Sequence, residues 1–254
     1  FGEAKNVDQL IYEVWKTEAA DERDLNGTND NGRAKAIRLY QGTASMVDGK
    51  TIIALNLVQD QEYTILFWAQ KSGTGVYNTE NLTNVHYGES TSTAYLTNQE
   101  AYAAFYASDF VSDEDPKSKR VVLTRPFAQI NIATKNTAEE YDVEVVSSKV
   151  TVKKVGTAFN VAKNVLDNPN TTENEYVSGV DPVSVVDFVF NTAEDPNGVN
   201  EYIWVEGQKY EYVAMNYVFA ASQNVTVEYE INTILTSKNL DGTDGKTTTA
   251  KVSN

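Results

Sequence analysis

The sequence has 254 residues, and its 36 acidic and 21 basic side chains give a formal net charge of -15. A chain this acidic repels phosphate backbones, so we expect no nucleic-acid partner. It contains no cysteine, which excludes disulfides and thiolate chemistry, and no apolar run approaches the roughly 18 residues that a membrane-spanning helix needs.

Segments typical of β-strands recur along the whole chain. The abundance of Tyr, Val and Thr favours pleated, half-buried surfaces over helices. Turn dipeptides such as Asn31-Gly32 and Asp48-Gly49 separate the segments, and many short strands at this spacing are typical of β-sandwiches. We therefore expect an all-β protein. The predicted strands cover residues 10–15, 36–40, 51–58, 62–70, 121–124, 128–132, 142–146, 149–152, 185–190, 209–219 and 224–231.

One short helix is expected in the first half of the chain. Residues 97–100 have the spacing of a capping box, and Tyr102, Phe105 and Tyr106 follow as an apolar stripe at helical spacing. We expect this helix to close one end of the first sandwich, with its aromatic stripe in the core.

A polar segment without periodicity, residues 167–175, predicts a domain boundary. Because the strand patterns resume on both sides of it, the boundary separates two sandwiches. The expected domains are an N-terminal β-sandwich over residues 1–165 and a C-terminal β-sandwich over residues 166–254.

A corner at Arg125-Pro126 lies between two apolar strand patterns, residues 121–124 and 128–132. Proline cannot donate a ladder hydrogen bond, so Pro126 belongs at a bulge, a strand start or a sheet edge. The corner therefore predicts an organised bend in a sheet. Its residues are structural, and none of them indicates catalysis.

Catalytic and metal-binding residues are scarce. His86 is the single histidine of the sequence and no Gly-x-Ser-x-Gly elbow occurs, so we interpret His86 as a surface or packing residue and expect no catalytic residue and no cofactor. Zinc lacks its usual ligands for the same reason. A pair of carboxylates for glycoside hydrolysis stays open as an alternative, because spacing along the chain does not show whether two acids face each other.

Three acidic loops carry the oxygen ligands that calcium prefers. Residues 24–32 fail the EF-hand pattern, because Asn29 and Lys35 stand where that loop needs Gly and Glu. Residues 113–115 and 241–245 are comparable clusters. We interpret all three as solvated loops.

Tryptophan is the residue type that could mark a carbohydrate site. Trp15 and Trp68 lie within strand patterns, and Trp68 is expected in the core. Trp204 follows a loop and is the candidate for an exposed ligand contact. A surface carbohydrate-binding lipoprotein is therefore the alternative function.

Five motifs, in order, resemble one branch of the Bacteroidales fimbrillin-like surface proteins, the Mfa-like or FimA-like subunits of type V pili. Four of the motifs are residues 62–70, 101–110, 148–160 and 210–218, and the five together cover about residues 10–235. The most specific is the family's RPFAQIN signature, extended here to Arg125, Pro126, Phe127, Ala128, Gln129, Ile130, Asn131 and Ile132.

The resemblance implies two transthyretin-like β-sandwich domains in an extracellular lipoprotein of the fimbrium, associated with the outer membrane and without enzymatic activity. It also implies that proteolysis removes an N-terminal strand and that a neighbouring subunit fills the place by strand addition. The expected partners are other pilin subunits and a host glycan or protein, and membrane contact would come only through the removed lipid anchor. A chain beginning at Phe1 fits such processing, and it fits trimming equally.

The C-terminal segment departs from the pattern of that family. The family continues into a further strand, whereas residues 245–254 carry only Ala250 and Val252 as apolar side chains and make a poor donor strand. Two explanations stay open at this point. Either the sequence lacks the end of its second domain, or the subunit has a terminal or accessory position in a fibre.

Overall fold

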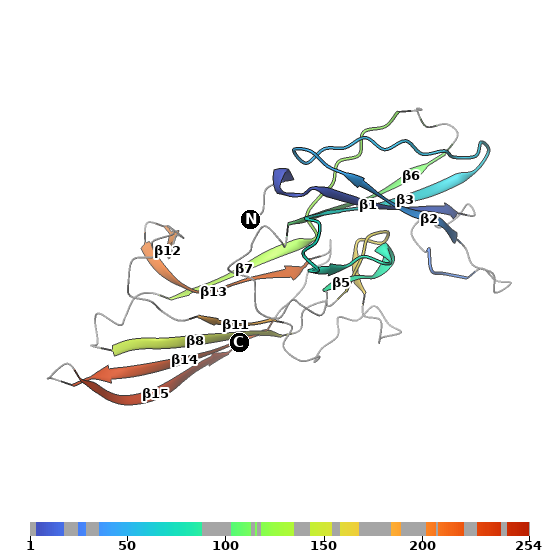
Figure 1. Cartoon of the computed structure of the whole chain (residues 1–254). Helices are drawn as coiled ribbons and strands as arrows, with labels where there is room; N and C mark the ends of the chain where they lie inside the picture. Colours follow the sequence, from blue (N-terminus) through green and yellow to red (C-terminus); the bar gives the residue numbers. More distant parts are fainter. Residues whose placement is uncertain are drawn as a thin grey trace. The chain divides into compact units, whose positions relative to one another are not determined.

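The computed structural model forms two compact units made largely of antiparallel strands (Figure 1). Unit 1 comprises residues 1–127, 156–176 and 219–225, and unit 2 comprises the remainder. Side-chain surroundings are described mainly in unit 1. The structure describes residues 4–17, 25–28, 36–87, 103–112, 115, 118–134, 143–153, 158–167, 184–188, 202–206, 208–220, 228–239 and 243–253.

The central sheet of unit 1 has the strand order β2-β1-β3-β6, and every neighbouring pair is antiparallel. These strands are β1 (Gln9–Thr17), β2 (Ala36–Ser45), β3 (Glu62–Gln70) and β6 (Ala104–Val111). The sequence predicted the bounds of β3 correctly, and β1 and β2 extend the predicted segments by a few residues. Large apolar and aromatic residues are frequent in β1 and β3, each of which contains Leu, Ile, Tyr and Trp, because both strands lie in the middle of this sheet.

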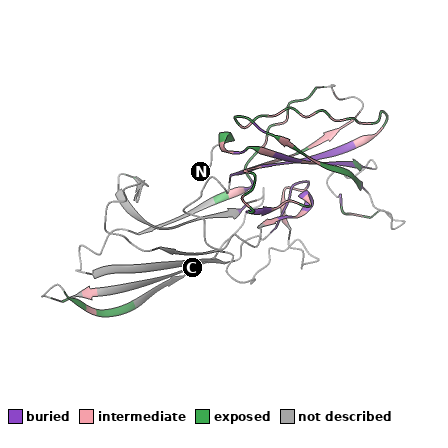
Figure 2. Cartoon of the chain, in the orientation of Figure 1, coloured by how far each residue is buried: buried purple, intermediate pink, exposed green. Residues whose placement is uncertain are grey.

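Both faces of the central sheet are covered, and this explains the apolar runs of its inner strands. All seven residues from Tyr63 to Ala69 are buried, whereas a sheet with one wet face would alternate apolar and polar residues. Figure 2 shows β1 and β3 largely in purple, with the edge strand β2 in green. One face carries Leu10 and Val14, and the other carries Ile11 and Trp68.

A smaller sheet accompanies the central sheet within unit 1. Its strand order is β10-β9-β5-β4, and the short 3-10 helix η2 (Leu82–Asn84) precedes β5. Aromatic rings fill the space beside it, since Phe159 packs on Trp68 and on Tyr106 with ring centroids 6.4 and 4.6 Å apart. The strands are β4 (Tyr77–Asn78), β5 (Val85–Tyr87), β9 (Ala158–Asn160) and β10 (Val165–Asp167).

Unit 2 contains two sheets, with the strand orders β11-β8-β14-β15 and β12-β13-β7. Residues 142–146 and 149–152, predicted as two strands, form one continuous strand, β8. The C-terminal segment, predicted to be a poor donor strand, pairs as β15 with β14 of its own unit. The strands are β7 (Phe127–Thr134), β8 (Val143–Lys153), β11 (Ser184–Phe188), β12 (Tyr202–Val205), β13 (Gln208–Phe219), β14 (Glu228–Lys238) and β15 (Asp244–Ser253).

The compact units differ from the expected domains in how the chain is divided. We expected a single division after residue 165, whereas the chain passes between the units several times and each unit is assembled from separate segments. The first passage follows Phe127, directly after the Arg125-Pro126 corner. Arg125 and Pro126 thus lie at the point where the chain leaves unit 1.

The predicted helix is wrong for the part of it that the structure describes. Phe105 and Tyr106 lie in strand β6, while residues 97–102 lie outside the described residues. In β6 the two rings point to opposite faces, with Phe105 against the core of one face and Tyr106 against Phe159 on the other. Because both faces are covered, adjacent apolar residues suit a strand here and imitate a helical stripe. The helical elements among the described residues are η2 and the 3-10 helix η1 (Ala4–Asn6).

Candidate functional site

Two segments with strand-like sequences lie on the central sheet of unit 1 without joining any ladder. They are residues 51–57 and 119–124, which we call the open layer, and they are drawn as coil above β1 and β3 in Figure 1. Within the described part of the chain, no backbone hydrogen bond joins residues 51–57 or 120–123 to another segment. Among the described residues, these N–H and C=O groups are therefore left without a backbone partner.

Side chains of the open layer alternate as in a half-buried strand. Ile53, Leu55 and Leu57 turn inward and pack against the core cluster of the central sheet, and Val121 and Leu123 pack against the same cluster. The residues between them are exposed, and Figure 2 shows the alternation of pink and green along both segments. Both segments therefore cover the same face of the sheet, with the geometry of strands that lack neighbours.

The first segment is anchored at its two ends. Before it, Val47 and Lys50 exchange backbone hydrogen bonds of 2.9 and 3.0 Å. After it, the hydroxyl of Tyr63 accepts a hydrogen bond from the N–H of Val58 at 3.0 Å and donates to the C=O of the same residue at 3.3 Å. Between these anchors the backbone makes no hydrogen bond to the described chain, so the inward side chains alone hold the segment to the sheet.

The second segment is anchored in the same manner, onto strand β6. Lys119 Nζ lies 2.8 Å from Asp109 Oδ1 and donates to the C=O of Phe110 at 3.0 Å. At the other end, Thr124 and Tyr106 exchange two backbone hydrogen bonds of 2.7 and 2.8 Å. Two fixed ends and an unpaired middle leave positions 120–123 able to pair without any refolding of the unit.

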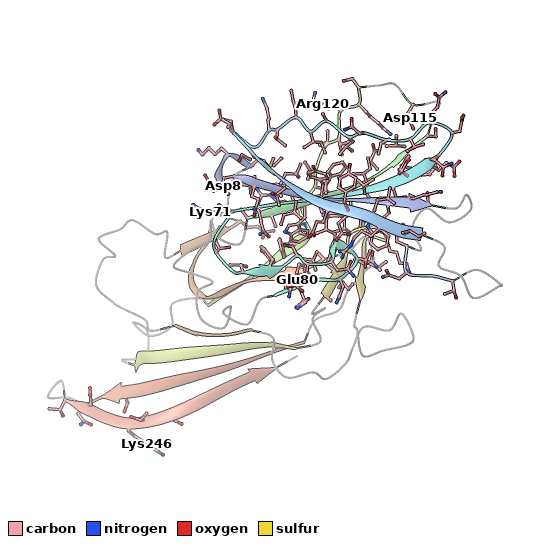
Figure 3. The ribbon with its side chains drawn as sticks, turned by 45° about the vertical axis from the view of Figure 1, so that its right-hand side comes forward. Asp8, Lys71, Glu80, Asp115, Arg120 and Lys246 are labelled. Carbon is pink, nitrogen blue, oxygen red and sulfur yellow. The ribbon has the colours of Figure 1, made fainter. Side chains whose placement is uncertain are left out.

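Electrostatics keep the first anchor of the second segment charged at neutral pH. The carboxylate of Asp109, which accepts a hydrogen bond from Nζ, raises the pKa of Lys119 above its ordinary value of 10.5. The backbone N–H of Ser112 lowers the pKa of Asp115 below 3.8. Asp115 and Arg120 are labelled on this part of unit 1 in Figure 3. The stability that comes from the raised pKa of Lys119 is lost only at high pH. The stability that comes from the lowered pKa of Asp115 is lost only at low pH. Both side chains are therefore charged, and the anchor is complete, at pH 7.

The floor beneath the open layer is apolar and closely packed. It consists of side chains from β1, β3 and the residues next to them, all of them less than a tenth exposed. The inward side chains of the open layer, such as Leu55 and Leu123, already cover this floor at every second position. Its members are Val7, Leu10, Val14, Met46, Tyr63, Ile65, Phe67, Ala69 and Ala103.

The corner residues of the signature lie beside the open layer, at the end of its second segment. The guanidinium carbon of Arg125 lies 5.1 Å from the centre of the Phe105 ring. Pro126 is buried, and its C=O accepts a hydrogen bond of 2.7 Å from Ala220. Phe127 opens strand β7 and stacks on Phe219, with ring centroids 5.0 Å apart.

The rest of the signature is described as backbone alone. Ala128 is exposed, and Gln129, Ile130, Asn131 and Ile132 continue β7, with side chains outside the described residues.

The other sequence-predicted residues are dispersed. Trp68 is fully buried, as expected. Trp204 is in β12 opposite Lys209, and its side chain lies outside the described residues. His86 is half-buried in β5, with Nδ1 3.2 Å from the C=O of Asn84.

The three acidic loops are described only in part. Residues 25–28 belong to the first, Asp115 to the second, and residues 243–245 to the third. Among the residues that the structure describes, no three potential ligands gather around one point where a metal ion could bind. In the same part of the chain, no helix has the length and apolar character to cross a membrane.

Sequence reasoning located the open layer but missed its significance. The prediction of strands at residues 51–58 and 121–124 is wrong, because neither segment forms a strand, although their side chains alternate between inward and exposed positions as in a strand. This alternation does not indicate whether a segment has hydrogen-bonded neighbours, so the sequence did not predict the missing ladder partners. The sequence feature closest to the open layer is the Arg125-Pro126 corner, which marks the end of its second segment.

Comparisons with known proteins give one family and three solved structures. A model described as a family of unknown function (DUF6562) matches residues 6–244. None of the curated proteins compared with this chain matches it. The fimbrial anchor protein Mfa2 from Porphyromonas gingivalis is similar at 11% identity and a TM-score of 0.38, over 96% of this chain and 74% of that one.

The other two structures are from Bacteroides ovatus. A candidate cell adhesion protein is similar at 16% identity and a TM-score of 0.39, over 97% of this chain and 76% of that one. A candidate adhesin is similar at 10% identity and a TM-score of 0.38, over 95% and 76%.

Proposed function

The chain belongs to DUF6562, a family of unknown function, and for this member we propose a structural and adhesive role in a cell-surface pilus. In this role the open layer receives an extended strand from a neighbouring subunit, and no enzymatic activity is involved. The observation that carries the proposal is the pair of strand-like segments, anchored at their ends, whose backbone is unpaired among the described residues.

The physical argument starts from the unpaired backbone. A strand placed along residues 51–57 or 120–123 would pair with N–H and C=O groups that now make no hydrogen bond to the described chain. Main-chain hydrogen bonds would supply affinity, and alternate side chains packed beside the inward residues of the open layer would fix the register. The inward residues already in place, such as Leu55 and Leu123, show which side-chain type the floor accepts.

The motif resemblance supports the cellular setting of this proposal. The five ordered motifs, including Arg125-Pro126, point to fimbrillin-like proteins with transthyretin-like sandwiches. We accordingly place the chain at the outer surface, as a lipoprotein whose anchor is removed on assembly. Other pilin subunits are its proposed partners.

Strand addition can be tested with peptides and proline substitutions. The probes are overlapping 15-residue peptides that cover the termini of the full gene product and of the surface proteins encoded beside it. We expect at least one to bind and to slow hydrogen exchange at residues 51–57 and 120–123. Asn56→Pro and Val122→Pro each remove an N–H that is unbonded among the described residues, so folding persists while peptide affinity falls by about tenfold or more.

The matched controls keep each N–H and shorten the side chain. Asn56→Ala and Val122→Ala should bind the peptide as the wild type does, because both side chains point outward. Protection that arises only outside the open layer, or proline variants that bind normally, would overturn the proposal. So would a complete set of peptides of which none binds.

A further inference from the structure

A shallow recess of unit 1, open to solvent over most of its extent, lies on the face of the central sheet opposite the open layer. Its volume is about 510 Å³. The register of β1 with β2 and β3 sets Gln9 and Ile11 beside Thr43 and Gln70 on this face. The chain from Gly75 to Glu80 forms the other wall. Asp8, Lys71 and Glu80 are labelled around this part of unit 1 in Figure 3.

Among the described residues, three amide side chains in this recess are hydrogen-bonded at one end only. Gln70 Oε1 accepts a hydrogen bond from Trp68 Nε1 at 3.0 Å, and no described acceptor meets its NH₂ group. Asn78 Oδ1 accepts from the N–H of Glu80 at 3.1 Å, and its NH₂ group likewise has no described acceptor. In Gln41 the NH₂ group is bonded instead, to the C=O of Thr79 at 2.8 Å and to Glu13 Oε1 at 3.4 Å, and its oxygen has no described donor.

Two further polar side chains have no internal partner in the described part of the chain. These are Gln9 and Thr43, which lie on neighbouring strands. The recess therefore combines pre-oriented donors, a pre-oriented acceptor and two side chains that both donate and accept. Ile11 and Tyr77, both buried, supply apolar surface among them.

The chemistry of this lining selects neutral, hydroxyl-rich molecules. A sugar hydroxyl donates and accepts at once, which matches a mixture of amide donors and acceptors. The lining contains no cation, and its one charged residue is Glu80. The neighbouring Arg38, which donates to the C=O of Glu80, is already paired with the carboxylate of Glu13, so an anionic ligand would meet no unpaired positive charge in the lining. The chain's net charge of -15 also disfavours the binding of an anionic ligand.

We propose that this recess, formed by Gln9, Gln41, Thr43, Gln70 and Asn78, is a binding site for neutral saccharides. The site is independent of strand addition, because it lies on the opposite face of the central sheet from the open layer. It also differs from the sequence-predicted candidate Trp204, which belongs to strand β12.

Titration with defined sugars tests the proposal on the intact chain. The neutral probes are maltotriose, cellotriose and N-acetyllactosamine, and the anionic probe is sialyllactose. Calorimetry and the side-chain NH₂ signals in NMR spectra report binding and its location. We expect at least one neutral probe to bind and to shift Gln and Asn side-chain signals, with sialyllactose about tenfold weaker or undetectable.

Two substitutions remove polar groups that make no internal hydrogen bond, so the fold should tolerate them. Gln9→Leu and Thr43→Val together should weaken saccharide binding by about tenfold or more. Asn78→Asp keeps the acceptor for Glu80 and removes the free donor, which should also weaken binding. Gln59→Leu, at an exposed residue outside the recess with no hydrogen-bond partner among the described residues, is the matched control and should bind as the wild type does.

Several results would overturn this inference. They are the absence of binding by every neutral probe at about 10 mM, equal binding of sialyllactose, and unchanged affinity in the Gln9→Leu/Thr43→Val variant. Asn56→Pro should leave saccharide binding unchanged. A failure of peptide binding with intact sugar binding would therefore reject strand addition alone, and the reverse would reject this site alone.

Discussion

Glu13 shows how one buried charge can fix the position of several elements. Its side chain is fully buried on β1 and accepts hydrogen bonds from Trp15 Nε1 at 2.9 Å, Arg38 Nη1 at 2.8 Å and the N–H of Leu82 at 3.1 Å. These donors come from β1, β2 and η2. A buried carboxylate is tolerable only when its oxygens are paired in this way, so Glu13 holds the edge strand and the 3-10 turn to the sheet.

We predict that Glu13→Gln lowers the free energy of unfolding by about 2–4 kcal/mol. The substitution removes the charge and sets an NH₂ group against donors that need an acceptor. Urea denaturation measures the effect. Glu62→Gln, at the half-exposed start of β3, is the control and should change stability by less than about 0.5 kcal/mol. Equal stabilities of the two variants would contradict the role given to Glu13.

Among the elements, the open layer is the one whose sequence and structure disagree in an informative way. Residues 51–57 alternate as a strand should, yet they are held by a turn at one end and by Tyr63 at the other. Strand β6 shows the opposite case, since Phe105 and Tyr106 fit a helical stripe but pair along β3. In both cases the decision depends on which neighbours the chain meets, because short apolar runs suit either structure.

Tyr63→Phe should release one end of the first segment, because the hydroxyl provides both hydrogen bonds to Val58. We expect a loss of about 1 kcal/mol in unfolding free energy and faster proteolytic cleavage within residues 51–60. Limited proteolysis followed by mass spectrometry measures the second effect. Tyr40→Phe is the control, since that residue is partly exposed and no hydrogen bond of its hydroxyl is seen in the described chain. Similar cleavage of the two variants would refute this anchor.

For the whole molecule, net charge and strand pairing together bear on how copies of the chain would associate. Two copies that each carry -15 repel one another at long range, while the proposed contact between them is apolar and made by main-chain bonds. Strand β15, at the C-terminal end of the described chain, already pairs with β14. Strand β15 therefore does not need a neighbouring subunit to form its hydrogen bonds on the side that faces β14.

If copies of the chain join by strand addition, raising the ionic strength from about 0.01 to 0.15 M should speed their association, because salt screens the repulsion between like charges. Time-resolved light scattering measures the rate. A net-neutral peptide that binds the open layer serves as the control, and its association rate should change little over the same range. A slower association of copies at higher salt would speak against contact between like-charged subunits.

The sequence by itself determined the all-β class, the bounds of β3 within the central sheet, the core position of Trp68 and the place of Pro126 directly before a strand. These features depend on side-chain alternation and on the backbone limits of proline, which are local properties of the chain. Only the tertiary structure decided that Glu13 is buried, that Phe105 and Tyr106 form a strand, and that residues 51–57 have no ladder partner among the described residues. The physical reason is that hydrogen-bond partners and burial come from segments distant in sequence, whereas alternation records only that one side of a strand is covered.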